Sequence, residues 1–126
     1  MIDAPVSIGE LVDKITILQI KKERIRDPQK VETVKKELDL LVNKYQTICT
    51  KILDEYMKEL REVNEKLWKI EDAIREKERA KKFNQDFIEL ARSVYKTNDI
   101  RSQIKFKINV ASNSYIMEVK SYEKYE

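Results

Sequence analysis

Two rows of polar and aromatic side chains at helical spacing are the part of this sequence best suited to chemistry. The first row is Asn64, Trp68, Glu71, Arg75 and Glu78, and the second is Ile88, Arg92, Tyr95, Asp99 and Ser102. Residues three or four positions apart lie on one face of a helix. A turn near residue 84 would make the two helices antiparallel neighbours, so the rows would face each other across one polar groove.

Such a groove could bind a ligand that carries phosphate or carboxylate. Guanidinium groups bind these anions with two parallel hydrogen bonds, and aromatic rings offer stacking surfaces. The candidate ligand-binding residues are Trp68, Glu71, Arg75, Arg92, Tyr95, Asp99 and Arg101. The alternative, which we favour, is a structural ladder between the helices. In it Glu71 or Asp72 pairs with Arg92, and Arg75 pairs with Glu89.

The amino-acid composition excludes most familiar active sites. The chain has no histidine, one glycine and one cysteine, Cys49. It therefore lacks a Ser-His or Cys-His dyad, a histidine zinc centre and a glycine-rich phosphate loop. Facing carboxylates could hold Mg²⁺, but nearly every acid here has a lysine or arginine within four residues. We predict no catalytic residue, no metal and no cofactor, and we favour a non-enzymatic protein.

Capping signals and apolar periodicity predict long helices. Ser7 and Glu10 have capping-box spacing, Asp27 precedes Pro28, and Asn84 can cap the helix that follows it. The expected helices cover residues 8–25, 28–82 and 85–110, and a packed C-terminal tail covers 111–126. All 126 residues would form one all-α domain.

The segment 28–82 allows two interpretations. Its apolar residues follow one frame as far as Ile52 and a second frame from Leu53 onward, and such an offset alters a heptad-like pattern locally. Residues 47–50 are mediocre helix formers. Because no glycine or proline breaks the segment, we favour one helix of about 55 residues, roughly 80 Å long, over two helices bent near 47–54.

Short connections between these helices predict long antiparallel hairpins with coiled-coil-like packing. The helix over 8–25 is apolar on more than one stripe, which indicates that several neighbours enclose it. Two helices in each half cannot supply those neighbours, so we predict a homodimer or larger oligomer. If this helix is buried, Asp13 and Thr16 need polar partners, which would be arginines of the groove or of a second chain.

The charges are mixed along the chain. The 26 basic and 23 acidic residues give a net charge of +3, and this interleaving is typical of a solvated helix surface, so we do not expect nucleic acid as a partner. No apolar run approaches the roughly 20 residues of a membrane span. The first residues lack the regions of a signal peptide. We therefore expect a cytoplasmic protein without a membrane partner.

Several blocks of sequence carry a resemblance that covers nearly the whole chain. They are Val6–Leu18, Leu67–Arg75, Phe87–Tyr95, Asn98–Arg101 and Glu118–Tyr122. Together they resemble an uncharacterised bacterial and phage-associated family of small helical proteins, a domain of unknown function. The resemblance implies no activity or cofactor. It implies that the groove and the first helix carry the motifs, while the middle of the segment 28–82 is variable.

Two functions fit these observations. The first is a non-enzymatic, oligomeric helical protein that acts as an interaction or scaffold module. The second is a binding protein or enzyme for a phosphorylated small molecule, such as a nucleotide or sugar nucleotide, with or without Mg²⁺. The two differ in whether the charges of the groove are already paired with one another.

Overall fold

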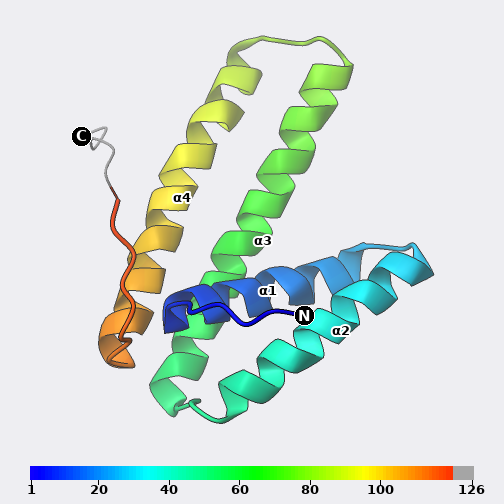
Figure 1. The fold of residues 1–126 in the computed structure, drawn as a ribbon. Coiled ribbons are helices and arrows are strands. Elements are labelled where there is room, and N and C mark those ends of the chain that lie inside the picture. The colour runs from blue at the N-terminus through cyan, green and yellow to red at the C-terminus, as the bar shows by residue number, and fades with distance from the viewer. Residues whose placement is uncertain (121–126) are drawn as a thin grey trace.

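The chain folds into an all-α structure in a computed structural model that describes residues 1–120. The described part contains four helices, α1 (Ile8–Arg24), α2 (Pro28–Gln46), α3 (Lys51–Arg79) and α4 (Gln85–Ala111). Helices α3 and α4 form a long antiparallel hairpin, and the shorter α1–α2 pair crosses it near the end where α4 finishes (Figure 1). No helix among these residues is both long and apolar enough to cross a lipid bilayer.

Each helix begins at a side chain that caps it. Ser7, Asp27 and Asn84 accept hydrogen bonds from the first amides of α1, α2 and α4. These groups have no partner within the helix, so a capping oxygen defines where the helix begins. The predicted starts at residues 8, 28 and 85 are confirmed.

The single helix predicted over 28–82 is wrong. The chain leaves the helix after Gln46, and α3 begins at Lys51, so the bend near 47–54 is the correct alternative. The hydroxyl of Thr50 accepts from the amide of Leu53 at 3.3 Å and starts the new helix. The Tyr45 hydroxyl donates to Asp54 Oδ1 at 2.7 Å across the turn. A residue that caps well competes with helix continuation, because its side chain replaces a backbone partner.

The bend also explains why the apolar residues follow two different frames. After it, Leu53 is 1% exposed whereas its neighbour Ile52 is 44% exposed. A straight helix would direct the two frames to different faces, whereas two helices can both turn their apolar faces toward α1. The frame offset therefore marks a change of direction in the chain.

Helix α1 is the centre of the fold, because it packs against α2, α3 and α4. Its buried apolar residues form one core with residues of the other three helices; these α1 residues are Leu11, Val12, Ile15 and Leu18. The prediction that several neighbours enclose this helix is confirmed. Those neighbours come from the same chain, so the core does not require the oligomer that we predicted. The oligomer remains a prediction.

The described part of the C-terminal tail, residues 112–120, runs back along α4 (Figure 1). The Ser114 hydroxyl accepts from the amide of Ile8 at 3.1 Å, and Ser7 Oγ donates to Glu118 at 3.3 Å. The tail therefore contacts the start of α1, as an extended arm. The remainder of the predicted tail, residues 121–126, lies outside the described residues.

The only glycine lies where α1 meets α4. The amide of Gly9 donates to Asn109 Oδ1 at 2.7 Å. A Cβ atom at this position would lie 2.7 Å from the backbone oxygen of Lys105 and 2.9 Å from Asn109 Oδ1. The two helices cross at a distance that only glycine permits.

We predict that Gly9→Ala destabilises the fold by at least about 1 kcal/mol, since a fixed backbone oxygen cannot yield to the new methyl group. The better helix propensity of alanine, about 1 kcal/mol, offsets only part of this cost. Urea denaturation followed by circular dichroism measures the change. As control, Lys22→Ala on the exposed side of α1 should stay within about 0.5 kcal/mol of the parent. An unchanged midpoint for Gly9→Ala would contradict the close crossing.

Candidate functional site

A buried carboxylate joins three helices. Asp13 of α1 is 0% exposed. Arg101 of α4 binds it with both Nε and Nη2, the Nε contact being 2.9 Å, and Asn64 Nδ2 of α3 donates to Asp13 Oδ1 at 2.9 Å. A buried charge is tolerated only when it is paired and hydrogen-bonded. The hydrogen bonds to Asp13 therefore fix how α1, α3 and α4 sit relative to each other.

The polar groups around Asp13 are satisfied in turn. The amide of Asn64 also donates to Thr16 Oγ1 at 2.8 Å, and Thr16 donates to the backbone oxygen of Asp13 at 2.8 Å. The prediction that Asp13 and Thr16 need polar partners is confirmed, and Arg101 is an arginine of the same chain. The hydrogen bond to Asp13 raises the pKa of Arg101 above its ordinary value.

Lys105 forms a second ionic cluster one helical turn further along α4. Its ammonium lies 2.7 Å from Glu10, 3.0 Å from Glu118 of the tail and 3.9 Å from Asp13. Burial by itself lowers the pKa of Lys105, whereas the hydrogen bonds that it donates to Glu10 and Glu118 raise it. The resulting pKa lies above that of free lysine. This cluster holds the tail against α1 and α4.

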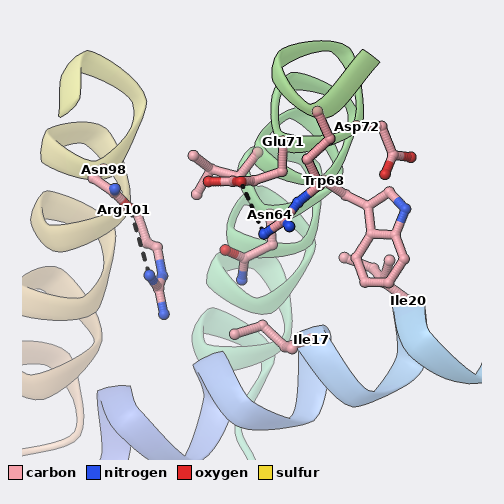
Figure 2. A pocket seen from close by; sticks show the side chains of 10 residues that line it. Ile17, Ile20, Asn64, Trp68, Glu71, Asp72, Asn98 and Arg101 are labelled. Atoms are coloured by element: carbon pink, nitrogen blue, oxygen red, sulfur yellow. Dashed lines mark hydrogen bonds and ion pairs between the residues drawn. The ribbon is translucent and has the colours of Figure 1, made fainter. Parts of the chain in front are cut away.

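A crevice of about 520 Å³ opens beside the Asp13 network, in the angle between α1 and the α3–α4 hairpin. Its lining comes from all three helices and consists of Ile17, Ile20, Asn64, Leu67, Trp68, Glu71, Asp72, Arg75, Asn98 and Arg101. Figure 2 shows Arg101 of α4 on one side and Trp68 of α3 on the other, with Asn64 and Glu71 between them. Isoleucines of α1 form the floor.

The crevice contains four of the seven predicted ligand-binding residues, namely Trp68, Glu71, Arg75 and Arg101. It does not contain Arg92, Tyr95 or Asp99, which belong to the other predicted row. Helix α4 turns Asn98 and Arg101 toward the crevice instead. The second row thus does not face the first. Of the predicted row on α3, Asn64, Trp68, Glu71 and Arg75 line the crevice and Glu78 does not. The sequence did not show which face of α4 lies opposite that row.

The charge pairs also differ from the predicted ladder. Within the described residues, Arg75 pairs with Glu71 at 3.8 Å and Arg92 with Glu89 at 3.7 Å, both within one helix. A hydrogen bond with Tyr95 raises the pKa of the exposed Arg92. The interhelical pairs that we favoured are replaced by Arg101 and Asp13. Exposed arginines reach an acid one turn away on their own helix more easily than one on a neighbouring helix.

Sequence reasoning missed the roles of Lys105, Asn109 and Glu118. One signal could have found the first of these. Glu10 and Asp13 are three apart on α1, and Arg101 and Lys105 are four apart on α4, so two acids and two bases lie on matching helix faces. Arg101, which the sequence predicted as a groove residue, therefore also belongs to the core.

The comparison with known proteins identifies a family that covers nearly the whole chain. The model of a family of unknown function, DUF6165, matches residues 2–125. The chain belongs to this family. No curated protein and no solved structure matches it. Membership in DUF6165 is in line with the resemblance found in the sequence and assigns no activity. In residues 1–120 of this DUF6165 chain, no three acidic or cysteine side chains are grouped to hold a metal ion.

We predict that Asp13→Asn lowers the free energy of unfolding by about 2–4 kcal/mol, because Arg101 keeps a partly buried charge without its counter-ion. Chemical denaturation measures the loss. The matched control is Glu37→Gln, which removes a surface pair with Lys14 whose two side chains are about half exposed and should change stability by less than about 1 kcal/mol. Equal effects of the two substitutions would contradict a structural role for Asp13.

We also predict that stability falls at alkaline pH. Free lysine has a pKa of about 10.4, and the pKa of Lys105 in the folded chain is higher. Below about pH 10 both states are protonated and the contribution is complete; as pH rises further, the unfolded state loses its proton first, so the folded state is destabilised. The variant Lys105→Met should lose part of this alkaline slope in denaturation at pH 9 to 11. The exposed neighbour Lys107→Met should keep the slope.

Proposed function

We propose that this protein is a non-enzymatic interaction module that pairs with a second copy of itself through the outer face of α4. The observation that carries this proposal is a row of exposed apolar side chains on one helix. Ile88, Tyr95, Phe106 and Val110 are 47%, 42%, 56% and 60% exposed. Single exposed apolar residues are ordinary, whereas four on one face of the same helix favour a contact surface, although Arg92, Asp99 and Ser102 lie between them on that face.

The spacing of the row supports one shared face. Successive members are 7, 11 and 4 residues apart, and each of these steps is close to a whole number of helical turns. A seam at such spacing can pack against a second helix. The face lies away from the core, because the buried residues of α4, such as Ile104 and Ile108, lie on its opposite side.

The charges along α4 favour a second copy in antiparallel orientation. Glu89 lies near the start of the helix, and Lys107 lies near its end. Antiparallel pairing would bring each Lys107 toward an acidic helix start of the other copy and would also oppose the two helix dipoles. Most soluble oligomers are two-fold dimers with one self-complementary patch, which this distribution satisfies.

The pairing of the charges supports a non-enzymatic role. Arg101 is bound by Asp13, Arg75 by Glu71 and Arg92 by Glu89. The crevice lining carries two arginines and two carboxylates, so a nucleotide or sugar phosphate would meet no excess of positive charge there. The balance of charge in the crevice therefore favours the interaction module over the phosphorylated ligand as the function of this chain.

Light scattering of the purified protein tests the proposal. At concentrations of up to about 100 µM the parent should have twice the mass of one chain. Phe106→Glu and Ile88→Lys should each give the mass of a single chain with unchanged helical circular dichroism, because a charge on the seam cannot be desolvated.

Leu40→Lys is the matched control, since Leu40 is 52% exposed on α2 and lies outside the seam. This variant should keep the dimer mass. A monomeric parent, or equal dissociation by the Leu40 and Phe106 variants, would overturn the proposal.

A further inference from the structure

The crevice contains an arginine whose orientation is set by the core. Asp13 takes Nε and Nη2 of Arg101 along one edge of the guanidinium, and Nη1 makes a 3.4 Å contact with Asn98. A guanidinium has five N–H groups, so those at its tip have no further partner among residues 1–120. Arg101 lines the crevice. It therefore presents a positioned pair of donors to an oxyanion.

Asn64 presents an acceptor to the same space. Both hydrogen bonds of its side chain are made by Nδ2, to Asp13 and Thr16, and Oδ1 accepts none from the described residues. The residue is only 5% exposed. No fully buried side-chain oxygen or nitrogen in the described part lacks a partner, so Oδ1 of Asn64 must open onto the crevice that it lines. A buried acceptor in such a place favours a ligand with an N–H group.

Glu71 lies beside this acceptor. Among residues 1–120 its ion pair is with Arg75, at 3.8 Å and on an exposed surface, and such pairs contribute little. Asp72, further toward Trp68, has no ion pair within residues 1–120 (Figure 2). Glu71 and Asp72 thus offer carboxylates to a ligand cation, which would replace Arg75 at Glu71, while the Arg101 end of the crevice favours an anion.

The remaining lining is apolar. Ile17 and Ile20 of α1 form the floor (Figure 2), and Leu67 and Trp68 of α3 also line the crevice. The volume of about 520 Å³ is within the range of small-molecule sites. An apolar or aromatic group can pack there against the indole.

We propose that this crevice binds a zwitterionic ligand of the α-amino-acid class. The ligand carboxylate binds the tip of Arg101, its ammonium lies between Asn64 Oδ1 and Glu71, and its apolar side chain packs on Trp68 and Ile20. The balance of two arginines and two carboxylates matches a zwitterion and not a phosphate dianion. A free amino acid and the end groups of a short peptide share this chemistry.

Trp68 is the only tryptophan in the chain, so its fluorescence reports directly on the crevice. The probe is L-phenylalanine, which does not absorb where tryptophan is excited selectively. We expect a saturable change in emission with a dissociation constant below about 1 mM and a matching heat in calorimetry. N-acetyl-L-phenylalanine lacks the ammonium, and phenethylamine lacks the carboxylate; each should bind at least about tenfold more weakly, the cost of one charged hydrogen bond.

Two variants locate the site. Glu71→Gln should weaken L-phenylalanine about tenfold through loss of a charged acceptor. Glu78→Gln, on the same helix but outside the crevice lining, should bind as the parent does. Circular dichroism confirms that both remain folded.

The dipeptide Gly-Phe, whose charged ends lie further apart, identifies the source of the ligand. Tighter binding of Gly-Phe than of L-phenylalanine supports a peptide terminus, and the reverse supports a free amino acid. The proposal is overturned if neither probe changes the fluorescence of Trp68 or gives heat, if the two singly charged analogues bind as tightly as L-phenylalanine, or if only inorganic phosphate or AMP binds.

Discussion

The buried carboxylate of Asp13 is the constraint on which the rest of this structure depends. A charge with no exposure is stable only if its partners surround it, and those partners come from α3 and α4. Helix α1 can therefore occupy only one position across the α3–α4 hairpin. Gly9 allows this approach one turn earlier, where the backbone of α4 comes close, and the Lys105 cluster with Glu118 adds the tail to the same junction.

The same network gives the crevice its chemistry. Arg101 and Asn64 serve the core with one part of each side chain and face the crevice with another. Because the core holds both groups, these two side chains would need no ordering to bind the proposed ligand, which is the main advantage of preorganised sites. Ile88 and Phe106 of the outer face of α4 do not line this crevice. The proposed self-association and the proposed ligand binding can therefore be separated by substitution.

Several features of the fold were accessible from local chemistry. Ser7, Asp27 and Asn84 cap their helices because side-chain oxygens act on amides only two or three residues away. The multiple apolar stripes of α1 correctly indicated an enclosed helix. The sequence favours one long helix over a bend near Thr50, since the helix propensities of residues 47–50 differ little from those of their neighbours. The decisive factor was the burial of Leu53 against α1, which is a tertiary contact.

The sequence by itself determined the all-α class, the starts of α1, α2 and α4, the absence of histidine chemistry and the polar face of α3 that carries Trp68, Glu71 and Arg75. Tertiary structure alone decided that Arg92, Tyr95 and Asp99 lie outside the crevice and that Arg101 is bound by Asp13. The physical reason is the range of the interactions. Periodicity and capping act within a few residues along the chain, whereas the rotation of one helix against another follows from packing and charge pairing between residues that are 88 positions apart, as Asp13 and Arg101 are.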